Sequence, residues 1–416
     1  MNAIATTAGP ILFWLVSSAF AAPDEEKLGR DLGYPIGNAA NWYYDESVRV
    51  GSFSHQSEIR GIFGGRNNTM RPAAVPLPLP SAPREPDYRW RVGEDRGLTV
   101  ADFLSRQRIM GLIVVKDGIV QVERYQYERK PSDRFVSQSM AKSFVALAVG
   151  FALAEGTIAS LDDRADRYAS GLRGTIYGET TLRNLLRMAS GAAYRQSYDG
   201  GGDPRRFADV VIRDGVEAAA RVVTVRETPQ GRRFNYSSPH SAMLAAVVRG
   251  ATGMNLSDYL TPRLWQAVGA QDAAYWNADR TGLEIGAASL NATLRDYARL
   301  GVVLANDGAH PHAKGTQIVP RDFLIEATDW KRAPKPFHPG IATPVYGYGY
   351  QFWLYPGETR RFMMLGVFGQ SMFVDPAQKL VIVQTAANAT AEAGGTTLAS
   401  ERDAFWRGVL QYDAKR

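Results

Sequence analysis

Cysteine is absent from the 416 residues of this chain, so disulfide bonds, thiolate zinc sites and cysteine nucleophiles are all excluded. Runs of five or six like charges are also absent, although the net charge is +6. Without such a run we expect no nucleic-acid-binding surface. Histidine is scarce, and His310-Pro311-His312 has no acidic residue at ligand spacing. We therefore expect neither a metal ion nor another cofactor.

The chain has no apolar run near its N-terminus that is long enough to cross a bilayer. Residues 11–16 are apolar but too few, so we expect no stable membrane insertion. The small residues Ala19-Phe20-Ala21 follow, and the combination predicts a signal peptide over residues 1–21 with export to the periplasm. Residues 1–23 contain no Lys or Arg, however. The alternative is a cytoplasmic protein with a partly apolar N-terminus.

The order of patterns along the chain predicts four parts. Residues 22–97, with a proline-rich run over 72–86, lack a periodicity that could build a core and form an N-terminal extension. Residues 98–145 and 301–416 contain the strand-like runs and form a domain of sheet and helix. Residues 146–300 have helical patterns and form an inserted helical subdomain.

The strand-like runs predict a mostly antiparallel sheet built from both ends of the chain. Asp117-Gly118 joins runs 109–116 and 119–127 in a hairpin, and further runs cover 348–354, 361–365, 372–375 and 380–385. Helices are expected over 139–153, 181–188, 204–212, 240–251, 256–267, 294–305 and 400–410. The fold class is therefore α/β of the α+β type, with helices flanking the sheet and an all-helical insertion.

The motif Ser139-Met140-Ala141-Lys142 opens a long apolar stretch that predicts a buried helix. Residues three apart on a helix share a face, so the serine and the lysine meet. A lysine in a buried, cation-rich pocket has a lowered pKa and can accept the serine proton. The positive field of the helix N-terminus favours the developing oxyanion. The alternative for Ser139 is a helix cap.

Two further segments supply partner groups for Ser139. Tyr236 lies between a turn and a helix, where its phenol can protonate a leaving group, and Ser238 can hydrogen-bond Lys142 or substrate. Gly366 stands at a strand edge and lets substrate approach the backbone, so the Val367 N–H can complete an oxyanion hole with the N–H of Ser139.

With these three elements in this order, the chain resembles the serine β-lactamase and penicillin-binding protein superfamily. Within it, the chain is most similar to 6-aminohexanoate-dimer hydrolases and related class C-like carboxylesterases. The similarity covers roughly residues 98–412 and includes Tyr236-x-Ser238, Leu365-Gly366-Val367-Phe368-Gly369-Gln370, Tyr346-Gly347-Tyr348-Gly349, and Met188-Ala189-Ser190-Gly191 ahead of Tyr194 and Tyr198.

The resemblance implies a β-lactamase/transpeptidase-like fold and hydrolysis through an acyl-enzyme on Ser139. Lys142 and Tyr236 share the role of general base, and the N–H groups of Ser139 and Val367 hold the oxyanion. Tyr198 lies in a loop that overhangs the pocket and contacts either substrate or core. The implied partner is a small ester or amide.

One departure from the family pattern bears on the substrate. Met364-Leu365-Gly366 stands where the family has Lys-Thr-Gly, so the lysine that grips a substrate carboxylate is missing. We therefore favour an ester or linear amide, and leave an arginine of the helical subdomain as a possible replacement. The alternatives are a penicillin-binding D-Ala-D-Ala carboxypeptidase or class C-like β-lactamase, and a non-catalytic binding or sensor protein. The oligomeric state stays open.

Overall fold

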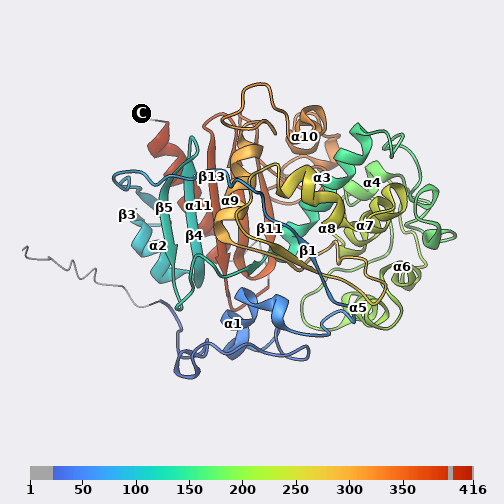
Figure 1. Cartoon of the computed structure of the whole chain (residues 1–416), viewed down its shortest axis with the longest axis horizontal. Helices are drawn as coiled ribbons and strands as arrows, with labels where there is room; N and C mark the ends of the chain where they lie inside the picture. The colour runs from blue at the N-terminus through green and yellow to red at the C-terminus, as the bar shows by residue number, and fades with distance from the viewer. Residues whose placement is uncertain (1–21, 392–396, 415–416) are drawn as a thin grey trace, which may run out of the picture.

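The computed structural model describes residues 22–391 and 397–414, so the expected signal peptide of residues 1–21 lies outside the described residues. Within the described residues, no helix is both long and apolar enough to span a membrane. The centre of the molecule is a seven-stranded antiparallel sheet in the order β5-β4-β13-β12-β11-β10-β9 (Figure 1). The strands are β4 (Ile109–Lys116), β5 (Ile119–Tyr125), β9 (Gly347–Tyr348), β10 (Trp353–Tyr355), β11 (Arg361–Gly366), β12 (Gln370–Asp375) and β13 (Leu380–Ala386).

The two ends of the chain meet inside this sheet, as the sequence predicts. Strand β4 pairs with β13, and Ile113 stands opposite Val383. The predicted hairpin is present as well, because Asp117 and Gly118 adopt positive φ angles of 52° and 77° between β4 and β5. Such angles give the turn the twist that a two-residue hairpin needs.

The predicted run 348–354 is interrupted instead of forming one strand. Strand β9 ends at Tyr348 and β10 begins at Trp353, with a turn between them in which Gln351 has a φ of 62°. The Gln351 side chain is buried and donates to the carbonyl oxygens of Leu185 and Leu186, at 3.1 and 2.9 Å. These hydrogen bonds to Leu185 and Leu186 hold the turn in place. The sequence of residues 348–354 does not indicate them, because they depend on contact with a distant segment of the chain.

Alternating strand residues point to the two faces of the sheet, and helices cover both. On one face, α2 (Val100–Arg106) and α11 (Thr397–Asp413) pack together, with the rings of Phe103 and Phe405 stacked at 4.3 Å. On the other face, α9 (Leu294–Ala305) lies across β13 and β12 (Figure 1). Burial of both faces explains why strand β13 is apolar along most of its length.

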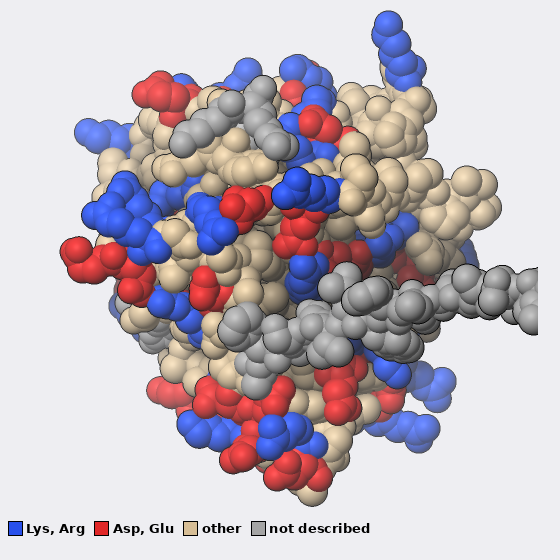
Figure 2. All heavy atoms as spheres, turned by 90° about the vertical axis from the view of Figure 1, so that its left-hand side faces the viewer, with Lys and Arg blue, Asp and Glu red and all other residues tan. Residues whose placement is uncertain are grey.

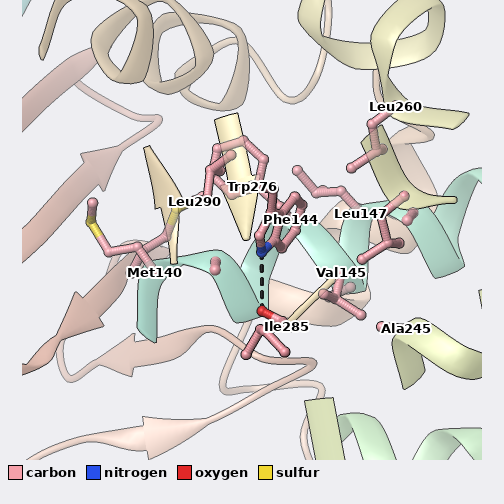
Figure 3. Close-up of a cluster of buried hydrophobic side chains, with 14 of the residues drawn as sticks. Met140, Phe144, Val145, Leu147, Ala245, Leu260, Trp276, Ile285 and Leu290 are labelled. Atoms are coloured by element: carbon pink, nitrogen blue, oxygen red, sulfur yellow. Dashed lines mark hydrogen bonds between the residues drawn. The ribbon is translucent and has the colours of Figure 1, made fainter. Parts of the chain in front are cut away.

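Helix α3 (Ala141–Ala154) runs from the sheet into the helical part and is buried along twelve of its residues. Phe144, Val145 and Leu147 pack among side chains from other elements, including Leu260 and Trp276 (Figure 3). The other helices are α4 (Leu182–Leu186), α5 (Gly202–Asp214), α6 (Val216–Ala219), α7 (Ser238–Thr252), α8 (Leu256–Leu260) and α10 (Arg321–Thr328). The central position of α3 gives the Ser139-x-x-Lys142 motif a rigid support.

Two features of residues 146–300 differ from the prediction of helices alone. A single helix is expected over 256–267, but the α-helix ends at Leu260 and a π-helical turn (Thr261–Trp265) follows it. Pro262 lies in this turn and has no N–H to donate to an α-helical hydrogen bond. The region also contains the short strands β7 (Ala274–Asn277) and β8 (Leu290–Ala292). They form a second sheet, in the order β1-β7-β8-β6, with β1 (Asn67–Met70) and β6 (Phe135–Val136).

The N-terminal extension is part of the folded body. It contains α1 (Arg49–Ser54), β1, and a hairpin of β2 (Trp90–Val92) and β3 (Asp95–Leu98). Val50 and Phe53 of α1 are fully buried in the same core as α3. The apolar residues of the extension are spaced irregularly, so this contribution to the core has no periodic signal in the sequence.

Candidate active site

Ser139 lies in a 3-10 turn (Gln138–Met140) that follows β6 and leads directly into α3. The preceding residue, Gln138, has a φ of 45°, a left-handed conformation that costs a non-glycine residue about 1 kcal/mol. Such strain is often held at functional sites by the surrounding fold. The turn leaves Ser139 half-buried, and the side chain lines a pocket.

Lys142 follows Ser139 by one helical turn, and the two side chains meet as predicted. The Lys142 Nζ donates to Ser139 Oγ at 3.0 Å and to the carbonyl oxygen of Ala287 at 2.5 Å. Lys142 is only 2% exposed, and this burial lowers its pKa to about 7. Desolvation is the cause, which agrees with the predicted burial, and neighbouring cations make no contribution. A sizeable neutral fraction at neutral pH can therefore accept the Ser139 proton.

Tyr236 approaches Ser139 from the loop before α7. Burial raises the pKa of its phenol to about 12, and a hydrogen bond with Ser139 acts in the opposite direction. The Lys142 Nζ lies 5.4 Å from the centre of the Tyr236 ring. The ring itself stacks on Trp353 of β10, with centroids 5.4 Å apart and an interplanar angle of 25°. A phenol of this pKa stays protonated at neutral pH and can donate to a leaving group.

Ser238 lies at the start of α7 but does not bond Lys142 in this structure. Its backbone N–H donates to Gln196 Oε1 at 3.1 Å, and both hydrogen bonds of the Lys142 amine go to Ser139 and Ala287. The predicted side-chain contact between Ser238 and Lys142 is therefore not made. Gln196, which the sequence did not single out, connects this helix start to the loop that carries Tyr198.

The N–H groups predicted to form an oxyanion hole come from segments far apart in the sequence. Val367 begins a second 3-10 turn (Val367–Gly369) at the end of β11, and Gly366 and Val367 line the same pocket as Ser139. Among the described residues, neither the Ser139 N–H nor the Val367 N–H has a hydrogen-bond acceptor. Two such donors beside a nucleophile can stabilise a negative oxygen.

Residue Phe368, next to Val367, has a left-handed φ of 59° and is held by the N-terminal extension. The Arg49 guanidinium lies 4.5 Å from the centre of the Phe368 ring. The rings of Tyr43 and Phe53 contact the same ring edge-on, with centroid distances of 4.9 and 5.3 Å. The extension thus braces the turn that presents the Val367 N–H.

A pocket of about 610 Å³ brings together five of the predicted residues, namely Ser139, Tyr236, Tyr198, Gly366 and Val367. It is also lined by Tyr346, which belongs to the Tyr346-Gly347-Tyr348-Gly349 similarity, and by residues that the sequence did not indicate, including Gln196, Trp353, Ser400 and Asp403. Trp353 lies in the predicted strand run 348–354, which gives no sign of a place at the pocket. Residues 399, 400 and 403 come from α11, whose sequence pattern indicates only an amphipathic helix.

The lining of this pocket shows whether another cation takes the place of the missing Lys-Thr-Gly lysine. Leu365 lines the pocket at the place of the family's Lys-Thr-Gly motif, and none of the described lining residues is Lys or Arg. No arginine of the helical subdomain therefore replaces the lysine. Across the described residues, no three His, Asp or Glu side chains gather in a way that could hold a metal ion.

Comparison with known proteins agrees with this geometry. The family model of beta-lactamases matches residues 99–401. The 6-aminohexanoate-dimer hydrolase of Paenarthrobacter ureafaciens is 25% identical over 345 residues, which cover 80% of this chain and 86% of that protein. These matches confirm the resemblance predicted from the sequence.

Solved structures share the fold. A putative 6-aminohexanoate-dimer hydrolase from Bacillus anthracis superimposes with a TM-score of 0.77 at 24% identity, covering 90% of this chain and 96% of that one. A family VIII carboxylesterase superimposes with a TM-score of 0.54 at 17% identity, covering 72% and 92%. These superpositions confirm the α+β fold class. Because the family model covers most of its length, the chain belongs to the beta-lactamase family, a family of serine hydrolases.

Proposed function

We propose that Ser139 is the nucleophile of a hydrolase that cleaves an ester or a linear amide bond through an acyl-enzyme. The observation that carries the proposal is the 3.0 Å contact between Ser139 Oγ and a lysine amine whose pKa burial lowers to about 7. A serine hydroxyl with a partly neutral amine at hydrogen-bond distance has a base available at neutral pH.

The reaction follows from the positions of the groups. Ser139 Oγ attacks the substrate carbonyl carbon while its proton passes to Lys142, which serves as the base. The Tyr236 phenol is a hydrogen-bond partner of Ser139, but with a pKa of about 12 it stays protonated and does not share this role. The carbonyl oxygen becomes an oxyanion between the N–H groups of Ser139 and Val367. Each such donor contributes about 3–4 kcal/mol to lowering the barrier.

Collapse of this intermediate breaks the scissile bond and leaves the acyl group on Ser139. The departing alkoxide or amine nitrogen takes a proton from the Tyr236 phenol, whose high pKa keeps it protonated until then. Lys142 returns its proton to the tyrosine. A water molecule then attacks the acyl-enzyme by the same route and releases the carboxylic acid.

Purified protein and the Ser139→Ala variant should be compared on short-chain p-nitrophenyl esters, on the 6-aminohexanoate dimer and on nitrocefin. The curated relative is named for the second of these substrates. We expect ester or amide turnover that disappears in the variant. Turnover of nitrocefin alone would favour a β-lactamase, and equal rates in both proteins would refute the role of Ser139.

A further inference from the structure

A second pocket, of about 720 Å³, lies beside the active-site pocket and is lined by arginines. Arg89, Arg91 and Arg96 come from the β2–β3 hairpin, and Arg407 comes from α11. Three other residues, Val345, Ser400 and Asp403, line this arginine pocket and the active-site pocket alike. The two pockets are therefore adjacent and are separated by these three shared lining residues.

The fold places these arginines together by a close approach of strand and helix. A Cβ on Gly408 would lie 2.6 Å from the carbonyl oxygen of Arg89, so only glycine lets α11 come this near to β2. Trp90 of β2 is buried, and strand alternation turns the neighbouring Arg89 and Arg91 outward. Arg407, beside Gly408, is exposed on the same side.

Most of the positive charge in the arginine pocket is uncompensated. Arg89 pairs with Asp87 at 2.8 Å, but Arg91, Arg96 and Arg407 form no ion pair with any described residue. Like charges around one hollow repel each other unless an anion joins them. An anion that enters the pocket would relieve this repulsion.

The only acidic residue that lines the arginine pocket among the described residues is Asp403, and its charge is already balanced. Its Oδ1 accepts from Arg402 at 2.9 Å, and its other oxygen accepts from the Tyr346 hydroxyl. On the side of the molecule where β3 and α2 lie, basic and acidic side chains are interspersed (Figure 2). Within the arginine pocket itself, no described carboxylate neutralises Arg91, Arg96 or Arg407.

We propose that the arginine pocket binds a carboxylate at the far end of the substrate whose scissile bond lies at Ser139. This proposal rests on the hydrolase function proposed above. Guanidinium groups bind carboxylates through paired, charge-assisted hydrogen bonds, and four of them line the hollow, three without an ion pair to a described residue. The shared residues Val345, Ser400 and Asp403 mark where the substrate chain passes from one pocket to the other.

The distance of the arginines from Ser139 indicates where the substrate carries its carboxylate. The active-site pocket has no Lys or Arg among its described lining residues, so a carboxylate next to the scissile bond has no partner there. A carboxylate several bonds away has the arginines. We infer a linear substrate with a terminal carboxylate, in contrast to a compact one that bears its carboxylate beside the reacting carbonyl.

Matched pairs of esters test this inference. One series is p-nitrophenyl monoesters of linear dicarboxylic acids of increasing length, each compared with the same compound capped as a methyl ester. A second series is acetate esters of 4-hydroxyphenylalkanoic acids and their methyl esters, which places the carboxylate on the leaving group. We expect kcat/KM to favour the free carboxylate by about 10-fold in one series, at an optimal length, because one charge-assisted contact has this strength.

The Arg91→Gln/Arg407→Gln double variant should lose this preference through a raised KM and leave the rate on the methyl-capped esters unchanged. Arg173→Gln is the control, because Arg173 is exposed in the helical subdomain and lines neither pocket. Equal rates on both members of every pair, or a preference that survives in the double variant, would overturn the proposal.

Binding to the Ser139→Ala variant separates this proposal from the proposed function. Calorimetric titration with linear dicarboxylates such as adipate should show binding that the arginine double variant lacks, whether or not any ester is hydrolysed. Hydrolysis of neutral esters without any carboxylate binding would refute the subsite and keep the hydrolase. Dicarboxylate binding without an effect on ester preference would make the pocket an independent anion site, and would also refute the proposed role.

Discussion

The carbonyl oxygen of Ser137 lies 2.6 Å from the position that a Cβ on Gly366 would occupy. This contact joins the turn that carries the nucleophile to the end of the strand that leads into the second 3-10 turn. No side chain fits between them, so the Ser139 and Val367 N–H groups can face the same point. The glycine of the strand edge is therefore required by the backbone of the nucleophile turn as well as by an approaching substrate.

Replacing Gly366 with alanine should separate the two turns. We expect kcat to fall on the order of 100-fold, because one oxyanion donor is displaced, and a smaller loss in the free energy of unfolding. Ester hydrolysis and urea unfolding of the Gly366→Ala variant measure the two effects. A variant with unchanged kcat would show that the Val367 N–H does not serve the reaction.

The activity should depend on pH through Lys142. Its pKa of about 7 means that the amine is protonated below this pH and available as a base above it. We expect kcat/KM for a neutral ester to rise tenfold per pH unit up to about pH 7 and then to level off. An unchanged rate between pH 5 and 8 would exclude Lys142 as the general base.

Stability should depend on pH through the same residue, with the sign set by its lowered pKa. Between about pH 7 and the ordinary lysine pKa near 10.4, the unfolded chain holds a proton that the folded chain lacks. The free energy of unfolding of the wild type should therefore rise with pH in this range, by at most about 1.4 kcal/mol per unit, relative to Lys142→Met. Urea titrations of both proteins at pH 7 and pH 9.5 measure the difference. A pH-independent difference would mean that Lys142 is charged in the fold.

Tyr236→Phe removes the phenol hydroxyl and keeps the ring that stacks on Trp353. We expect a loss in kcat on the order of 100-fold or more for an alkyl ester or amide, whose leaving group needs a proton. The loss should be smaller for a p-nitrophenyl ester, because nitrophenolate departs without one. Equal losses for both substrates would show that Tyr236 acts through its hydrogen bond with Ser139 and does not protonate the leaving group.

The extension should influence catalysis through Phe368, although it contributes none of the reacting groups. Tyr43→Leu removes an edge contact with the Phe368 ring, and we expect kcat to fall a few-fold with little change in KM. Tyr44→Leu is the control, since Tyr44 is 56% exposed and its ring contacts Tyr43, whereas Phe368 is contacted by Tyr43 and Phe53. Equal kcat values in both variants would contradict the bracing role.

The parts of the site that the sequence predicted are those with a local pattern. Ser139 and Lys142 share a helix face, and the Asp117-Gly118 turn has its own conformational signature. Trp353 and Asp403 had no such signal, because their place at the pocket depends on how β10 and α11 pack against the sheet. The burial that lowers the Lys142 pKa follows from the apolar residues around the motif, whereas the absence of a cation contribution depends on how the complete core packs around α3.

The pairing of β4 with β13 sets a limit on when the enzyme can become active during its synthesis. Ser139 and Lys142 leave the ribosome early, whereas Val367 and β13 follow after more than half the chain length has been added. At about 5–20 residues per second, the nucleophile waits roughly ten seconds or more for its oxyanion donor. A nascent chain therefore carries an inert serine, and hydrolysis begins only once the C-terminal strands close the sheet.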